Sequence, residues 1–346
     1  YTNDLKMVLL PFFGLCSIQR NLLLRYFLLF LALDIFSLPC FGFYRSSSKI
    51  ARPLGCQRQR RSGMEIPSSA KKPKIFATKG GEECHGQVEV VVVGSLNTDL
   101  VAYTPTLPGR GETLLGTSFE TGFGGKGANQ AVMASRMGAK VGFIGALGSD
   151  SFGDSYMVHL ESEGIDCRHV ARVEGSTGVA QICVDREGQN FIVVVPGANG
   201  RVDAAAVGAA APLLAGAWVV VCQGEIPTEG TLAALQLGKQ QGLITILNTA
   251  PADPNLPEEI FGFIDLLCLN EPELEVISGC DTSSLDQIKK AALDIIAKGP
   301  QHIVVTMGEK GALIVSQNED SFVEAQKVAA VDTVGAGDAF VGALAA

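Results

Sequence analysis

The string Asp332–Phe340, DTVGAGDAF, carries the sharpest chemical pattern in the chain. Gly335, Ala336 and Gly337 predict a tight turn into a helix, where converging N–H groups and the helix dipole favour an anion. Asp338 then lies in the first helical turn, where a carboxylate can accept the proton of an attacking hydroxyl. An isolated Asp at such a position is often only a helix cap, but the nine-residue string as a whole predicts an anion site with a base beside it.

The segment Gly122–Gln130, GFGGKGANQ, predicts a second binding loop. Its closely spaced glycines are costly unless the backbone must approach another group closely. Lys126 and Asn129 offer donors for sugar hydroxyls or a phosphate. A Walker-type loop needs Ser or Thr after Gly-Lys, and Gly127 stands there instead. The alternative interpretation is a flexible glycine loop before a helix.

Polar residues follow two predicted strands, where ligands bind in open α/β sheets. Asn97 and Asp99 belong to GSLNTD, directly after the first strand, and their amide and carboxylate groups suit vicinal hydroxyls. Glu225 follows the strand Trp218–Cys222. Taken alone, Asn97 and Asp99 are explained at least as well by a turn or cap role. Glu225, taken alone, is explained at least as well by a position in a solvated loop.

Two further junctions suit a nucleotide and its metal. Asn270 and Glu273 form N-x-x-E where a strand meets a helix, which suits hydrated Mg²⁺ and phosphate, although the same spacing suits an N-cap with a first-turn acid. The segment Thr306–Gly311, TMGEKG, ends a strand with two glycines that would let a nucleotide lie against the backbone. An ordinary glycine turn explains that segment equally well.

The rest of the pattern predicts the elements that position these residues. Short apolar runs alternate with helical patterns, which indicates βαβ units and a sheet covered by helices on both faces. The predicted strands are Val88–Gly94, Val141–Ile144, Trp218–Cys222, Ile244–Leu247, Leu266–Leu269, Ile303–Thr306 and Ala312–Val315. The predicted helices are Gly127–Met137, Gly153–Glu163, Thr228–Gln241, Glu271–Ser278 and Leu285–Lys298.

Two segments break this alternation and predict a small β lid. Asp99–Gly122 is polar with short strand signals, and Gly178–Val195 reads as a hairpin around Asp185–Gly188. A small sheet inserted into a βαβ fold can close on a substrate. Closure would exclude water, which competes as an acceptor in phosphoryl transfer.

Charge divides the chain into two unlike parts. Residues 1–87 hold 13 Lys and Arg against 5 Asp and Glu, whereas the remainder holds 14 against 31. A body this acidic argues against a nucleic-acid partner, since phosphate backbones require a basic face. The nine Cys lack a C-x-x-C pair and the four His lack metal-ligand spacing, so neither a disulfide framework nor a zinc site is expected.

The first 87 residues are expected to form a disordered leader. Their apolar stretch is interrupted by Arg25 and is too short for a membrane-spanning helix, which needs about 20 residues. The basic segment Arg45–Lys79 suits a targeting peptide, and the alternative is a non-native translated sequence. The predicted location is cytoplasmic, or a plastid or other organelle if the leader is genuine.

These motifs, in this order, resemble the ribokinase family of pfkB-type carbohydrate kinases over essentially all of residues 88–346. The two family signatures correspond to GGKGANQA and DTVGAGDAF. GSLNTD, QGEIP and PGAN at Pro196–Asn199 are more similar to ribokinases than to fructokinases, ketohexokinases or adenosine kinases. The resemblance implies a doubly wound, mostly parallel α/β sheet with a β lid, and ATP-dependent phosphorylation of the 5-hydroxyl of D-ribose.

The resemblance also implies a role for each matching residue. Asp338 would be the catalytic base, and Gly335, Ala336 and Gly337 the anion hole for the transferred phosphoryl group. The residues implied to hold ribose are Asn97, Asp99, Gly125, Lys126, Asn129, Glu225 and Asp338. Those implied to contact ATP are Asn270, Thr306, Gly308, Glu309, Gly311 and Gly337. Glu273 would support Mg²⁺, and Asp332 with the carbonyl of Val334 would match part of a K⁺ site.

Two departures from the family pattern keep other interpretations open. Asn248-Thr249-Ala250-Pro251 stands where the family usually has Asn-Pro-Ala-Pro. The sequence stops at Ala346, before helices that in the family complete the adenine pocket and the K⁺ site, so we expect a C-terminally truncated domain. The alternatives are another pfkB-family kinase, acting on fructose or adenosine, and a sugar-binding protein without activity. The expected partners are the sugar, ATP and a second copy of the chain joined through the lid, with no stable membrane insertion.

Overall fold

The computed structural model describes residues 87–328 and 333–346. The predicted leader, apart from Gln87, lies outside the described residues, and so does the predicted K⁺ ligand Asp332. Within the described ranges, no helix has the length and apolar character needed to cross a membrane.

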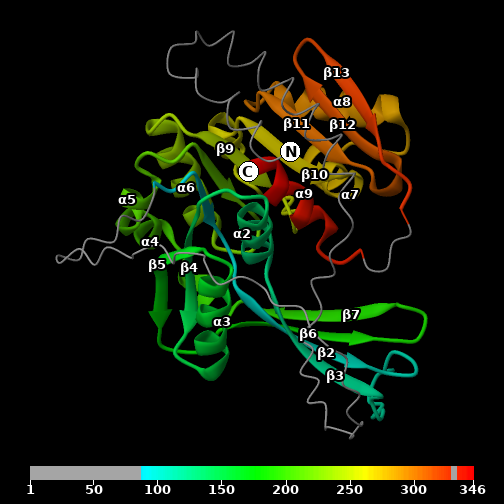
Figure 1. Cartoon of the computed structure of the whole chain (residues 1–346). Coiled ribbons are helices and arrows are strands. Elements are labelled where there is room, and N and C mark those ends of the chain that lie inside the picture. Colours follow the sequence, from blue (N-terminus) through cyan, green and yellow to red (C-terminus); the bar gives the residue numbers. More distant parts are fainter. Residues whose placement is uncertain (1–86, 329–332) are drawn as a thin grey trace, which may run out of the picture.

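A nine-stranded sheet forms the centre of the molecule (Figure 1). Its strands, in spatial order, are β13 (Asp320–Glu324), β12 (Gly311–Ser316), β11 (His302–Thr306), β10 (Leu266–Asn270), β9 (Ile244–Asn248), β8 (Val219–Cys222), β1 (Val90–Val93), β4 (Val141–Gly148) and β5 (Asp166–Val173). The strands from β11 to β5 pair in parallel, and β12 and β13 are antiparallel. This mostly parallel sheet confirms the predicted fold class.

Helices cover both faces of the sheet, because successive strand residues point to opposite sides. Val90 and Val92 pack in one core with α2 (Lys126–Arg136), α3 (Ser151–Ser162) and α9 (Ala336–Ala345). Val91 and Val93 pack in the other core. The elements of that second face are η3 (Gly197–Arg201), α4 (Ala204–Ala209), α5 (Ala211–Leu214), α6 (Thr228–Gln240), η4 (Glu258–Phe263), α7 (Glu271–Ser278) and α8 (Leu285–Ile296).

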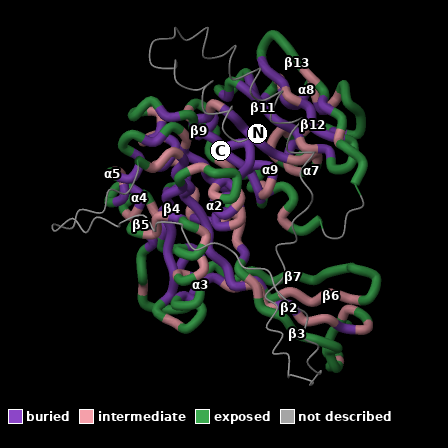
Figure 2. Tube along the Cα trace, viewed as in Figure 1, coloured by how far each residue is buried: buried purple, intermediate pink, exposed green. Residues whose placement is uncertain are grey.

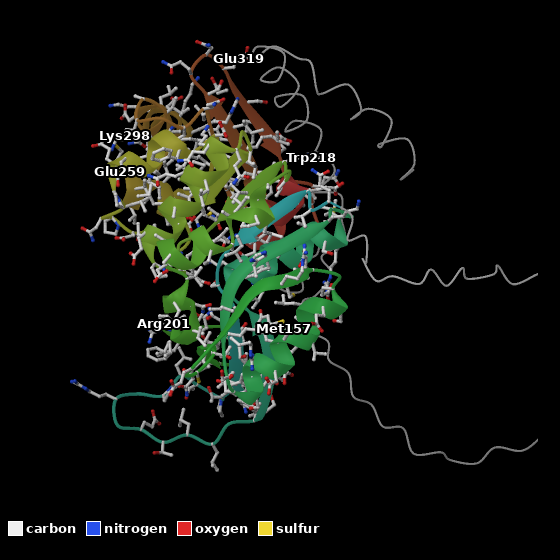
Figure 3. The ribbon with its side chains drawn as sticks, turned by 90° about the vertical axis from the view of Figure 1, so that its left-hand side faces the viewer. Met157, Arg201, Trp218, Glu259, Lys298 and Glu319 are labelled. Atoms are coloured by element: carbon white, nitrogen blue, oxygen red, sulfur yellow. The ribbon has the colours of Figure 1, made fainter. Side chains whose placement is uncertain are left out.

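Charged side chains lie on the outside of these layers. Arg201, Glu259, Lys298 and Glu319 project from the surface in Figure 3 and are exposed, whereas Figure 2 shows the strands of the centre buried. Strands covered on both faces read as continuous apolar runs, which is why the sequence pattern located them.

A second, four-stranded sheet projects from the body (Figure 1) and confirms the predicted small β-sheet. Its order is β3 (Ser118–Gly124), β2 (Asn97–Tyr103), β6 (Gly178–Val184) and β7 (Asn190–Val195). Phe123 of β3 stacks on His159 of α3 with ring centroids 4.3 Å apart. The buried Tyr156 hydroxyl of α3 donates to the Gly124 carbonyl. These contacts fasten the base of the small sheet to the main body.

Several elements were not predicted. The edge strands β5 and β13 mix polar and apolar residues without a regular period, and each has a single buried residue, so they lack an uninterrupted apolar run. The short α4 and α5 lie in an Ala-rich segment without a helical period. Asn97 and Asp99 belong to strand β2 and not to a free loop, because only three residues separate the end of β1 from the start of β2.

Candidate functional site

The N-terminus of α9 opens on a cavity at the carboxyl ends of β9, β10 and β11. Gly335 adopts φ 73°, a left-handed conformation that glycine reaches without strain, and precedes the first helical residue. The Ala336 N–H donates to the Thr333 carbonyl at 3.2 Å, and the Ala339 N–H to the Gly335 carbonyl at 2.8 Å. Gly337 and Asp338 belong to the first turn, whose N–H groups have no intrahelical partner. The turn therefore lies at the cavity with N–H groups that the helix does not use, and the anion site stays a prediction.

Asp338 is buried with 6% of its surface exposed, and two amides of α2 hold its carboxylate. The Asn129 amide donates to Oδ2 at 3.0 Å, and the Gln130 amide donates to Oδ1 at 3.1 Å. Burial raises the pKa of Asp338, while the charge of Lys126 and the two amide donors oppose that rise. A base that is partly desolvated but hydrogen-bonded as the carboxylate suits proton abstraction near neutral pH.

The cavity has a volume of about 180 Å³ and gathers most of the predicted phosphate-binding residues. Its lining residues are Lys126, Asn248, Ala250, Cys268, Leu269, Asn270, Glu273, Thr306, Thr333, Gly335, Ala336, Gly337, Asp338 and Val341. These residues come from α2, α7, α9 and three adjacent strand ends, which the parallel topology brings to one edge of the sheet.

Asp99 and Glu225 form an acidic pair beside the cavity. Glu225 accepts a 2.6 Å bond from the Ser95 hydroxyl and a 3.0 Å bond from the Lys126 N–H, which ties the loop after β8 to the start of α2. Burial and then the charge of Glu225 raise the pKa of Asp99 to about 7. A Cβ on Gly124 would lie 2.3 Å from Asp99 Oδ2, so the motif glycine leaves room for this carboxylate.

Asn97 is buried and already hydrogen-bonded within the protein. Its Oδ1 accepts from the Asn199 amide at 2.8 Å, and Asn199 also bonds the main-chain N–H and carbonyl of Leu96. Asn199 thus fixes the junction between β1 and the small sheet. None of the described hydrogen bonds involves the Asn97 amide nitrogen, so this atom can donate to a ligand.

Asn270 and Glu273 form a capping box at the start of α7. The Glu273 N–H donates to Asn270 Oδ1 at 2.8 Å, and the Asn270 N–H donates to Glu273 Oε2 at 3.0 Å. Both residues also line the cavity, so the cap and the predicted ligand roles are compatible. Burial raises the pKa of Glu273, and its hydrogen bond with Asn270 and the charge of Lys126 oppose that effect.

The segment Thr306–Gly311 divides between the cavity and its surroundings. Thr306 lines the cavity, whereas Gly308, Glu309 and Gly311 do not. A Cβ on Gly311 would lie 1.9 Å from the Val323 carbonyl, so packing against β13 accounts for that glycine. Val334, the other predicted K⁺ ligand, is 68% exposed at the turn before α9.

Sequence reasoning did not single out three buried amides beside Asp338. Gln130, Gln223 and Asn248 lie on α2, after β8 and at the end of β9, and hydrogen bonds connect them. Gln130 ends a motif that drew attention for its glycines and its lysine. Gln223 directly follows strand β8 and precedes Glu225 by two residues. Its polar side chain at a strand end was the one feature of the sequence that could have indicated it.

Comparisons with known proteins place this arrangement in context. A sequence profile described as pfkB family carbohydrate kinase matches residues 87–346. The chain is 42% identical over 259 residues to ribokinase of Mus musculus, covering 74% of this chain and 80% of that protein. It is 40% identical over 259 residues to deoxyribokinase of Salmonella typhi, covering 75% and 85%. A solved structure of Arabidopsis thaliana ribokinase complexed with ribose and ATP is similar with a TM-score of 0.68 at 30% identity, covering 74% and 84%.

Proposed function

This chain belongs to the pfkB family of carbohydrate kinases and is a sugar kinase similar to ribokinases, and on that premise we propose that it transfers the γ-phosphoryl group of ATP to the 5-hydroxyl of D-ribose. The observation that carries the proposal is the position of Asp338. A buried carboxylate lies in the first turn of α9, one residue after the glycine turn, and both line the same cavity. A base and an anion site are thereby adjacent.

In this mechanism Asp338 accepts the proton of the sugar hydroxyl as its oxygen attacks the γ-phosphorus. The N–H groups of Gly335 and Gly337 stabilise the charge on the transferred group. The N–H of Ala336 is the third member of this proposed anion hole, and in this structure it donates to the Thr333 carbonyl. The bond between the γ-phosphorus and the β,γ-bridging oxygen breaks, and ADP leaves with that oxygen. Lys126 lines the cavity beside Asp338, where its charge balances that of the phosphates.

The proposed ribose site lies between the small sheet and the cavity. Its residues are Asn97, Asp99, Gly125, Lys126, Asn129 and Glu225, with Asp338 at the reacting hydroxyl. Carboxylates and amides in pairs suit the vicinal hydroxyls of a furanose, since each hydroxyl both donates and accepts. The hydrogen bonds from Ser95 and from the Lys126 N–H to Glu225 support this grouping.

The proposed ATP site continues from the cavity along β10 and β11. Its residues are Asn270, Thr306, Gly308, Glu309, Gly311 and Gly337. Glu273 fits a hydrated Mg²⁺, because its carboxylate borders the cavity and only Oε2 is engaged in the described capping box. Mg²⁺ would neutralise phosphate charge. The Val334 carbonyl is a proposed K⁺ ligand, and its proposed partner Asp332 lies outside the described residues.

The test is ADP release by the full chain with ATP, Mg²⁺ and K⁺ in the presence of ribose, 2-deoxyribose, fructose or adenosine. We expect ribose to give the highest kcat/KM, with the 5-phosphate identified by ³¹P NMR. The similarity to a deoxyribokinase makes 2-deoxyribose the second candidate. A preference for fructose or adenosine would contradict the proposed substrate, and silence with every acceptor would contradict the kinase activity itself.

Ribose binding should strengthen as the pH rises through about 7. Sugar hydroxyls would donate to the ionised Asp99, whose pKa burial and Glu225 raise to about 7. The dissociation constant of ribose, measured by calorimetry, should therefore fall as the pH rises from about 6 to about 8. Asp99→Asn should weaken binding and remove this pH dependence, and a wild-type dissociation constant independent of pH would contradict the role.

The same shift predicts how Asp99 affects stability without sugar. The folded state holds this proton more tightly than the unfolded chain, whose Asp pKa is near 3.8. The free energy of unfolding of the sugar-free chain should therefore fall as the pH rises from 3.8 through about 7, because the unfolded chain releases this proton first.

We also propose a homodimer through the small sheet. Among the described strands β7 pairs only with β6, and its side chains from Phe191 to Val195 are between 44% and 60% exposed (Figure 2). Exposed apolar edge strands are stable in water when another chain covers them. Val193→Lys should give a monomer in sedimentation velocity, whereas the control Val158→Lys, at a 66% exposed position on α3, should not. Unchanged sedimentation of the β7 variant would exclude this surface.

A further inference from the structure

A chain of buried amides ends on the carboxylate of Asp338. Gln130, Gln223 and Asn248 have 0%, 1% and 7% of their surfaces exposed. The Gln130 amide nitrogen donates to Asp338 Oδ1 at 3.1 Å and to Asn248 Oδ1 at 3.0 Å. The Gln223 amide nitrogen donates to Gln130 Oε1 at 2.7 Å. Every polar atom of the Gln130 side chain is thus engaged.

The direction of this chain is fixed by a main-chain group. The Asn248 amide nitrogen donates at 3.1 Å to the Cys268 carbonyl, which can only accept. Asn248 must therefore turn its oxygen toward Gln130, and Gln130 must turn its NH₂ group toward Asn248 and Asp338. A reversed Gln130 amide would place oxygen against the oxygens of both neighbours.

The amide orientations in this chain leave one buried side-chain oxygen of the described residues without a hydrogen-bond partner. Gln223 turns its NH₂ group toward Gln130, and its Oε1 is buried without a hydrogen-bond partner in the described part of the chain. A Cβ on Gly94 would lie 2.1 Å from that oxygen, so the glycine leaves room for it. An unpaired buried acceptor is unfavourable. It persists here because a reversed Gln223 amide would place its oxygen against Gln130 Oε1, and reversing Gln130 as well would disrupt the bonds from Gln130 to Asp338 and to Asn248.

We propose that Gln130 is a positioning residue that holds the Asp338 carboxylate in its reactive orientation, an inference that rests on the proposed function. Asn129 and Gln130 each engage one oxygen from the α2 side. A carboxylate has about four lone-pair sites, so lone pairs remain on both oxygens for the hydroxyl in the cavity. The charged groups that act on Asp338 are Lys126 from α2, Glu225 from the loop after β8 and Glu273 from α7.

The test compares steady-state kinetics of the full chain with Gln130→Met, which keeps the volume and removes both donors. We expect kcat to fall by roughly 10- to 100-fold, as small misplacements of a catalytic group do, with KM for sugar and for ATP unchanged. In an Asp338→Asn background, Gln130→Met should cause no further loss, because residues acting through one another are not additive. An undiminished kcat, or an equal loss in both backgrounds, would overturn the proposal.

Two further variants keep the test decisive if Gln130→Met folds poorly. Gln223→Met leaves both N–H donors of Gln130 in place but removes the donor to Gln130 Oε1. The value of kcat should therefore fall by less than in Gln130→Met, again with KM unchanged. Ser135→Ala is the matched control, since it removes one 2.6 Å bond from the same helix to the Glu163 carbonyl, away from the cavity. A fall in kcat with Ser135→Ala would show a general effect on α2, and an unchanged kcat with Gln223→Met would show that the orientation of Gln130 does not matter. Either result would overturn the proposal.

The activity of the wild-type chain distinguishes a failure of the proposed function from a failure of the proposed role of Gln130. Activity on another sugar would contradict only the proposed substrate, and the comparison would proceed with that sugar. Wild-type activity that survives Gln130→Met would contradict only the role of Gln130. An inactive wild-type chain would overturn both.

Discussion

Asp338→Asn should lower kcat by roughly a thousandfold, within the 10²- to 10⁴-fold that a positioned base contributes, while ribose still binds. The reason is chemical, because an amide of the same size cannot accept the hydroxyl proton. The affinity for ribose should largely survive, since the other proposed sugar ligands are untouched. Single-turnover phosphorylation and calorimetric titration with ribose measure the two effects separately.

The control for Asp338 is a carboxylate that does not line the cavity. Asp154 lies in the first turn of α3, with 78% of its side chain exposed and an ion pair to Arg172. Asp154→Asn should leave both kcat and ribose affinity unchanged, because an exposed ion pair contributes little to stability. Turnover of Asp338→Asn close to that of Asp154→Asn would remove Asp338 as the base.

The strands that frame the site could be predicted because the fold buries them on both faces. Val90–Val93 and Val141–Gly148 are buried along their whole length and read as continuous apolar runs. The edge strand Asp166–Val173 could not be predicted in this way, since only part of it is buried. Strand β7 is apolar yet exposed, and the hairpin turn before it was the signal that located it.

The residues of the candidate site differ in whether the local sequence indicates them. Asp338 and Gly335 were predictable because a sharp turn and a helix start impose local sequence requirements. Gln130, Gln223 and Asn248 were not predicted, because their hydrogen bonds join elements that are far apart in the sequence. Gln130 and Asn248 are separated by 118 positions, and only the packing of α2 over the ends of β8 and β9 brings them together. Neither amide has a local pattern that distinguishes it from an ordinary polar residue.

Packing also explains why the GGKGAN motif needs its last glycine. Gly127 in the first turn of α2 has an ordinary helical conformation, so positive φ is not the reason. A Cβ there would lie 2.6 Å from the Ser95 nitrogen and 2.8 Å from the Gly94 Cα, both main-chain atoms at the end of β1. The main chain would have to move to admit any side chain. The glycine therefore sets how closely α2 approaches the sheet.

Gly127→Val should consequently damage both stability and catalysis. Overpacking against main-chain atoms costs about 1–3 kcal/mol or more in the free energy of unfolding. Displacing α2 would also move Asn129 and its bond to Asp338, so we expect kcat to fall at least as far as in Gln130→Met. Urea unfolding and steady-state kinetics on the same preparation measure the two effects.

The matched control for Gly127 is a helical glycine with space around it. Gly208 in α4 has ordinary φ, and a Cβ there would meet no atom within 4 Å. Gly208→Ala should therefore raise the free energy of unfolding by about 0.5–1 kcal/mol, because alanine loses less backbone entropy in a helix, and should leave kcat unchanged. The two substitutions differ in sign because only Gly127 faces another main chain. If Gly127→Val unfolded at the wild-type urea concentration and kept its turnover, close approach of α2 to β1 would not be what holds Asp338 and its amides in place.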